Sequence, residues 1–144
     1  VNETYVRQAF KERGLDYEAQ KQTLSNYEVQ GKDLLCNTTV TRPKEAGQIW
    51  LDGGQIVPAS SPKCTLLGIR KYQDDGKKVA VAYLYDKSLG IKLFADKAFY
   101  SVSAANPSGV DIVPFLLKKD AENYAEKANG KVVTYAEALT AAKR

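Results

Sequence analysis

The sequence of 144 residues contains no histidine and no methionine. Histidine is the commonest general base and metal ligand, and methionine supplies the thioether ligand that soft copper favours. Any chemistry must therefore use the two cysteines, Cys36 and Cys64, or carboxylates, lysines and tyrosines. A nucleophilic cysteine needs an activating base, which histidine usually supplies, so we expect a protein that is not an enzyme.

Clustered charge and long apolar runs are also missing. The 21 basic and 17 acidic residues give a net charge of +4, and both signs are spread evenly along the chain. Because nucleic-acid binding needs clustered lysine and arginine, we expect no nucleic-acid partner. No apolar run approaches the roughly 18 residues that a membrane span needs, so we expect no transmembrane segment in this chain.

The sequence repeats one order of elements, which is a strand, a helix and a strand. The 44% hydrophobic content is enough for one compact core or for two small half-domains that share an interface. The two copies of the pattern cover 55–59, 61–73 and 77–85, and then 110–115, 118–129 and 131–135. Ile-Val-Pro and Gly-Lys recur at matching places in both copies.

This repeat predicts an α+β fold of two similar ββαβ half-domains packed together, with an N-terminal helical arm. The predicted divisions are 1–33 for the arm and linker, 34–86 for the first half and 87–144 for the second half.

Two local signals place the cysteines. Ser61 followed by Pro62 is typical of a helix start, which puts Cys64 just inside a helix near its positive end. The β-branched stretch 34–41 predicts a strand, with Cys36 at or near its beginning.

Other signals mark where elements begin and end. Asn2 can cap a first helix that ends at Gly14, and Asp-Gly-Gly at 52–54 predicts a hairpin between two strands. Pro114 is expected to bound the apolar strand of the second copy, and Gly130 to end the helix that follows it.

The remaining polar and aromatic residues predict no further site. Asp74 and Asp75, like most other aspartates here, lie next to glycine or in predicted turns, where aspartate is favoured for local hydrogen bonding. The aromatic residues, Trp50 and Tyr83 among them, fall at the periods of strands and helices, which is typical of core packing.

The two cysteines leave three alternatives open. They can form a two-thiolate site for Cu(I), because monovalent copper accepts two soft ligands. They can form a structural disulfide, which would contribute roughly 3 to 4 kcal/mol in the chain-entropy model. They can also remain free, buried thiols. Two cysteines alone are too few for a zinc framework, which needs four ligands.

Six short segments occur in a specific order along the chain: 36–38 (CNT), 47–54 (GQIWLDGG), 62–64 (PKC), 110–115 (VDIVPF), 120–121 (DA) and 130–132 (GKV). In this order and spacing, the chain from Leu35 to Leu139 resembles the NosL-type accessory lipoproteins of nitrous oxide reductase, which are periplasmic copper-binding proteins. The resemblance implies a fold of two similar ββαβ halves, in agreement with the repeat.

The resemblance also implies a function. It implies a non-catalytic protein that holds or delivers Cu(I) for a partner metalloenzyme or copper-transport protein. Such a protein would be periplasmic, or anchored to the membrane and facing the periplasm, with its lipid anchor upstream of Val1. The alternative is a structural or interaction protein on the same scaffold, with Cys36 and Cys64 joined as a disulfide.

The family places copper-binding character around a cysteine that has methionine two residues on. Cys36 stands at that cysteine and Thr38 at that methionine. Thr65 follows Cys64, and Ser108 precedes Gly109, where the family often has methionine. Because a hydroxyl is a hard, weak ligand for Cu(I), the soft site reduces to thiolates, with Cys36 the first candidate ligand and Cys64 the second.

Overall fold

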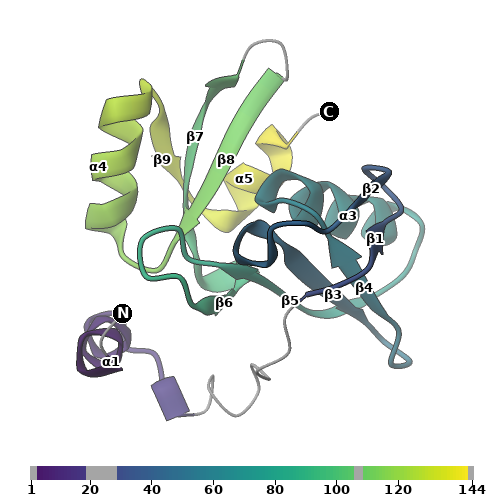
Figure 1. Ribbon diagram of the computed structural model, residues 1–144, viewed down its shortest axis with the longest axis horizontal. Helices are drawn as coiled ribbons and strands as arrows, with labels where there is room; N and C mark the ends of the chain where they lie inside the picture. The colour runs from purple at the N-terminus through teal and green to yellow at the C-terminus, as the bar shows by residue number, and fades with distance from the viewer. Residues whose placement is uncertain (1–2, 19–28, 106–108, 143–144) are drawn as a thin grey trace.

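The computed structural model describes residues 3–18, 29–105 and 109–142 and contains a mixed α+β fold (Figure 1). Four helices have both ends within these residues: α1 (Glu3–Glu12), α3 (Pro62–Asp74), α4 (Lys118–Ala128) and α5 (Tyr135–Ala141). The predicted α+β class and the N-terminal helix are therefore confirmed. None of the helices in the described ranges combines the length and the apolar character that crossing a membrane requires.

The strands form three antiparallel sheets. A two-stranded sheet joins β1 (Lys32–Asp33) and β2 (Thr38–Thr39). The four-stranded sheet has the order β4-β3-β5-β6, from β3 (Gly47–Leu51), β4 (Ile56–Ala59), β5 (Val79–Tyr85) and β6 (Lys92–Phe94). The three-stranded sheet has the order β8-β7-β9, from β7 (Phe99–Ala105), β8 (Gly109–Phe115) and β9 (Lys131–Val133).

The same element order occurs twice. In β3-β4-α3-β5 and in β7-β8-α4-β9, the first strand lies in the middle, with the second strand on one side and the strand after the helix on the other. The predicted division between residues 86 and 87 puts 92–94 in the second half, whereas β6 pairs with β5 in the first sheet. Tyr85 lies opposite Lys92 in that pairing, so the four-stranded sheet extends beyond the predicted boundary.

Several predicted starts and turns are present. Ser61 caps α3 by accepting a hydrogen bond from the N–H of Cys64 at 3.0 Å, and Pro62 is the first residue of the helix. The hairpin between β3 and β4 turns at Gly53 and Gly54, whose φ angles of 96° and 95° suit glycine. The predicted cap residue Asn2 lies outside the described residues, and α1 ends at Glu12, just before Gly14.

The stretch 34–41 is not one strand, which corrects the prediction. Its β-branched composition indicated a strand, but the chain reverses between β1 and β2, and Asn37 takes a left-handed conformation with φ 55° in that turn. Asparagine tolerates this conformation better than most residues, so a turn forms inside a stretch of high β-propensity. Cys36 therefore lies in a turn.

Two residues expected to end elements do something else. Pro114 lies inside β8 instead of bounding it, because β8 is an edge strand and the missing N–H of proline removes no ladder hydrogen bond there. Asn129, with φ 54°, is the C-cap residue that ends α4. Gly130 does not end the helix but lies close to the backbone of β7. A Cβ at Gly130 would lie 2.6 Å from the carbonyl oxygen of Val102 on β7.

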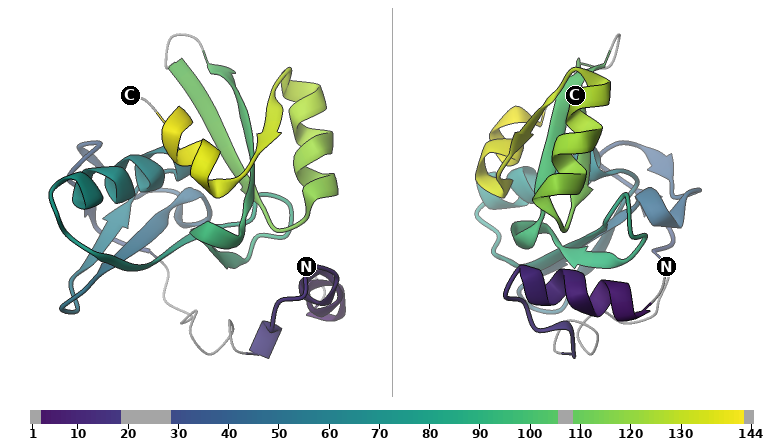
Figure 2. Two further views of the ribbon diagram at one scale, coloured as in Figure 1. Left: turned by 180° about the vertical axis from the view of Figure 1, so that it is seen from behind. Right: turned by 90° about the vertical axis from the view of Figure 1, so that its left-hand side faces the viewer.

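One main core joins the two units, and α1 packs against it. Val6, Ala9 and Phe10 of α1 are buried in this core. The Arg13 guanidinium donates a hydrogen bond to the carbonyl of Leu116 and lies 4.5 Å from the centre of the Phe99 ring. In Figures 1 and 2, α1 accordingly lies at the end of the molecule next to β6 and α4.

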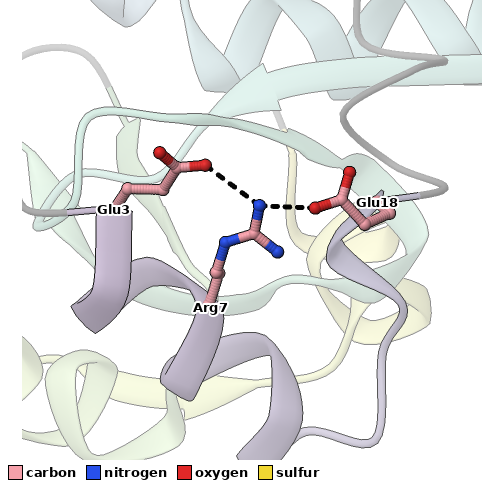
Figure 3. A network of polar contacts seen from close by, with 3 residues as sticks. All are labelled: Glu3, Arg7 and Glu18. Carbon is pink, nitrogen blue, oxygen red and sulfur yellow. Dashed lines mark hydrogen bonds and ion pairs between the residues drawn. The ribbon is translucent and has the colours of Figure 1, made fainter.

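Arg7, on the solvent side of α1, connects the first residue of this helix with Glu18, which follows the helix in the chain (Figure 3). Its guanidinium forms ion pairs with Glu3, at 3.1 Å, and with Glu18. The pKa of Arg7 is raised, mainly by the hydrogen bond to Glu18. Because all three side chains are exposed, this network contributes little to stability.

Candidate metal centre at Cys36 and Cys64

The two cysteines are joined to each other. Cys36, in the turn between β1 and β2, forms a disulfide with Cys64 in the first turn of α3, with an S–S distance of 2.04 Å and a Cα–Cα distance of 6.3 Å. Cys36 is half-buried and Cys64 is 9% exposed. Of the three alternatives that the sequence leaves open, the structure contains the disulfide, and neither cysteine is a free thiol in it.

Asp33 fixes the turn that carries Cys36. Its carboxylate is 2% exposed, and one oxygen accepts hydrogen bonds from the N–H groups of Leu35 and Cys36, at 3.0 and 2.9 Å. The other oxygen accepts from the N–H and the hydroxyl of Ser60, at 2.8 and 2.9 Å. Asp33 therefore ties the Cys36 turn to the chain that leads into α3, where Cys64 lies.

Sequence reasoning did not single out Asp33. Its hydrogen bonds to the N–H groups of Leu35 and Cys36 could have been predicted. An aspartate that precedes a turn often accepts hydrogen bonds from the backbone N–H groups two and three residues later. The bonds to Ser60 span 27 residues and depend on the tertiary fold, so no local pattern predicts them.

Asp33, Cys36 and Cys64 form a group of potential metal ligands. One carboxylate oxygen and the two sulfur atoms all lie within 4.8 Å of one another. While the two sulfur atoms are joined as a disulfide, they are not thiolates and do not act as metal ligands. After reduction they would provide two soft ligands, which suit Cu(I), whereas each Asp33 oxygen is a hard ligand that already accepts two hydrogen bonds.

Two of the three hydroxyl residues at the family's methionine positions lie in the described part of the chain. Thr65 is fully buried, and its hydroxyl donates to the carbonyl of Ser61 at 2.8 Å. Thr38 lies exposed on β2, and Ser108 falls outside the described residues. Among the described residues, the group of potential metal ligands at this place is the two cysteines with Asp33 beside them.

The other candidate groups have structural roles. Asp74 and Asp75 are exposed at the end of α3, where Asp75 is the C-cap residue and lies 3.4 Å from the ammonium of Lys71. The rings of Trp50 and Phe94 both contact that of Tyr83, at centroid distances of 6.0 and 5.4 Å. Asp75 therefore serves the end of α3, and the three rings pack on one another. Tyr100 and Phe115 lie in core clusters, as predicted for the aromatic residues.

Comparison with known proteins gives a result only at the level of structure. No family model and no curated protein matches the sequence. The crystal structure of the copper chaperone NosL from Shewanella denitrificans matches with a TM-score of 0.62 and 22% identity, over 78% of this chain and 92% of that chain. This chain has the NosL fold.

A second structure of the same kind is also similar. The solution structure of the apo-NosL protein from Achromobacter cycloclastes has a TM-score of 0.46 and 23% identity, over 63% of this chain and 82% of that chain. The family resemblance read from the sequence is matched by the structural likeness to the Shewanella denitrificans protein, which has the higher TM-score.

Proposed function

We propose that this chain is a non-catalytic copper-handling protein that holds Cu(I) for a partner protein, with the reduced Cys36 and Cys64 as its ligands. The observation that carries the proposal is the pairing of the two cysteines within a NosL fold. Two soft ligands that meet at one place satisfy the low coordination number that Cu(I) accepts.

Copper binding at this pair requires prior reduction. A dithiol reductant supplies two electrons and two protons, which break the S–S bond and give two thiols, while the reductant becomes a disulfide. Each thiol then loses its proton as its sulfur binds Cu(I), because the thiolate is the ligand. Cys64, near the N-terminus of α3, lies where a thiolate is favoured.

The same proposal places the protein outside the cytoplasm. Disulfides persist in the periplasm and at cell surfaces and are rare in the cytosol. We therefore propose a periplasmic location, or a membrane-anchored one facing the periplasm, and a metalloenzyme or copper-transport protein as the partner. We also interpret the repeated element order as two half-domains, 34–86 and 87–144, with β6 in the second range but paired with β5 of the first.

The test combines a thiol count with a copper titration. Protein purified without reductant should show no free thiol and should bind no Cu(I) in competition with a chelator under anaerobic conditions. After reduction it should bind one Cu(I) per chain, and Cys36→Ser and Cys64→Ser should each abolish that binding. If the reduced protein binds no Cu(I), the proposal is wrong.

A matched pair of variants tests where the ion sits. Thr38→Met restores a thioether two residues after Cys36, and we expect it to tighten Cu(I) binding to the reduced protein. Thr39→Met adds the same thioether to the neighbouring exposed residue of β2 and serves as its control. Equal affinities for the two variants would contradict a copper ion held at Cys36.

A second candidate function is a structural or interaction protein with a permanent disulfide. The observation that favours it is the disulfide itself, beside an Asp33 carboxylate whose oxygens both accept hydrogen bonds from the surrounding chain. It predicts that the reduced protein binds no Cu(I) in the same titration.

A further inference from the structure

A cleft lies between the first and second units, beside the cysteine pair but distinct from it. It has a volume of about 440 Å³, which is within the range of small-molecule sites. Thr38 and Thr41 of the segment after Cys36, Ser61 before α3, and Asp111 and Val113 of β8 contribute to its walls. The cleft therefore forms where the segment after Cys36, the start of α3 and the edge strand β8 meet.

Three basic side chains border this cleft. Arg42, Lys44 and Lys87 line it, and the same three line an adjoining cavity of about 330 Å³ beside Gly90. They therefore stand where the two cavities meet. Arg42 and Lys44 come from the segment between β2 and β3, and Lys87 comes from the turn between β5 and β6. Residues far apart in sequence thus bring positive charge to one place.

The three basic residues share the two cavities with Glu45, Asp86 and Asp111, of which Asp86 is buried and accepts hydrogen bonds from the N–H groups of Leu89 and Leu116. Glu45 pairs with Arg42 at 3.3 Å, and Asp111 also lines the cleft. The Lys44 ammonium donates to the carbonyl of Gly90 at 2.9 Å and lies 5.1 Å from the centre of the Tyr85 ring, and neither partner carries a charge. The pKa of Lys92 on β6 is lowered, first by burial and then by the charge of Lys44.

We propose that this cleft binds a small organic anion through carboxylate or phosphate groups, with Arg42, Lys44 and Lys87 as its cationic contacts. Arginine and lysine form the strong, charge-assisted hydrogen bonds that such oxyanions accept. The threonine and serine hydroxyls can donate further hydrogen bonds, and Tyr85 and Tyr124 provide a partly apolar wall. The inference does not rest on copper binding, because no contact in it uses Cys36 or Cys64.

The experiment uses the oxidised, metal-free chain, so that its result is independent of copper. Citrate and inorganic phosphate are added separately in an NMR titration that follows the backbone amides. We expect saturable shifts at the amides of the segment 38–45 and of Ser61 and Lys87. Binding should weaken as salt is added, because the cationic contacts are exposed.

Paired variants decide whether the basic residues are the contacts. Arg42→Gln/Lys87→Gln should weaken citrate binding roughly tenfold or more, as expected for charge-assisted hydrogen bonds. Lys119→Gln/Lys127→Gln removes the same charge from exposed positions on α4 and should leave the affinity unchanged. Thermal melting checks that both variants fold.

Three results would overturn the proposal. They are an absence of saturable shifts with both anions, an affinity unchanged by Arg42→Gln/Lys87→Gln, and an equal loss in the α4 control. Hexaglutamate provides a further arm. If it binds in the cleft while citrate and phosphate do not, the cleft serves an acidic protein segment, and the small-anion proposal is wrong.

Discussion

At the scale of single residues, Asp33 connects the two loops that bring the cysteines together. Its four hydrogen bonds join the turn after β1 to Ser60, and the carboxylate is almost completely buried. Asp33→Ala would leave three backbone N–H groups without this acceptor. We expect the free energy of unfolding to fall by about 2 to 4 kcal/mol, measured by urea unfolding of the oxidised protein.

Two other substitutions frame this prediction. Asp33→Asn keeps one acceptor oxygen and should lose less stability than Asp33→Ala. Asp52→Ala changes an exposed aspartate of the β3–β4 hairpin and should change stability by less than ~0.5 kcal/mol. If Asp33→Ala proved as mild as Asp52→Ala, the carboxylate would not hold the cysteine loops.

A second buried aspartate predicts a dependence on pH. Asp86 is 1% exposed and accepts from the N–H groups of Leu89 and Leu116, which joins the end of β5 to the chain before α4. Burial raises the pKa of Asp86 above its ordinary value of 3.8, while these N–H groups oppose the rise. The folded protein therefore holds this proton more tightly than the unfolded chain does.

The sign of the effect follows from that difference. As pH rises from about 3.8 to the pKa of the folded state, the unfolded chain releases the proton first, so the contribution of Asp86 to stability decreases. Asp86→Asn does not titrate. We expect the free energy of unfolding of the native chain, minus that of Asp86→Asn, to fall with pH across this window in urea unfolding. Parallel curves would contradict the raised pKa.

Individual residues were predictable from the sequence when their partners were close along the chain. Ser61 as the cap of α3 and the aspartates of the turns depend on neighbours within a few positions. Asp33 and Asp86 each bind N–H groups about 30 residues away, at Ser60 and Leu116. Nothing in the local pattern marks such bonds, because they exist only after the elements have packed.

At the scale of elements, α3 lies against β3 at a distance that only glycine allows. A Cβ at Gly47 would lie 2.0 Å from the Thr65 hydroxyl oxygen and 2.8 Å from the Thr65 methyl carbon. Both residues are buried, so neither can move into solvent. We expect Gly47→Ala to lower the free energy of unfolding by about 1 to 3 kcal/mol, as overpacking does.

A double-mutant cycle measures this contact. Thr65→Ala removes the hydroxyl and methyl groups that the added Cβ would meet, and it leaves the Thr65 Cβ, at 2.9 Å, in place. Gly47→Ala should therefore cost less in the Thr65→Ala background than in the native chain. Additive costs would show that the helix and the strand are not in contact through this pair.

Helices and strands could be predicted from the sequence where the hydrophobic periodicity and the turn residues agreed. The strand predicted at 77–85 is present as β5, from Val79 to Tyr85, and the helix predicted at 61–73 is present as α3, which begins at Pro62. The stretch 34–41 had high β-propensity, but it also contained Asn37, which accepts the left-handed conformation of a turn. Likewise, Pro114 could be placed inside a strand only once β8 was known to lie at a sheet edge.

At the scale of the whole molecule, the repeated order of elements was readable because Ile-Val-Pro and Gly-Lys recur in matching places. The pairing of β6 with β5 could not be predicted, because the composition of a three-residue strand does not show which sheet it joins. The cysteine pairing was left open for a different reason. Both the disulfide and a thiolate metal site need the two sulfurs at the same place, so proximity alone does not separate them.

The disulfide predicts how the stability of the whole chain responds to reduction. It joins residues 28 positions apart, and closing a loop of this length contributes roughly 3 to 4 kcal/mol in the chain-entropy model. In a domain of this size each kcal/mol corresponds to roughly 2 to 4 °C in Tm. We expect reduction to lower the Tm by about 10 °C, measured by circular dichroism with and without a dithiol reductant.

The double variant Cys36→Ser/Cys64→Ser is the control for this measurement. Its Tm should lie near that of the reduced protein and should not respond to the reductant. Added Cu(I) then separates the two functions proposed for the pair, because a ligand that binds only the folded state raises the Tm. For the copper carrier, Cu(I) restores part of the loss in the reduced native chain and none in the double variant. For the scaffold with a permanent disulfide, Cu(I) restores nothing in either protein.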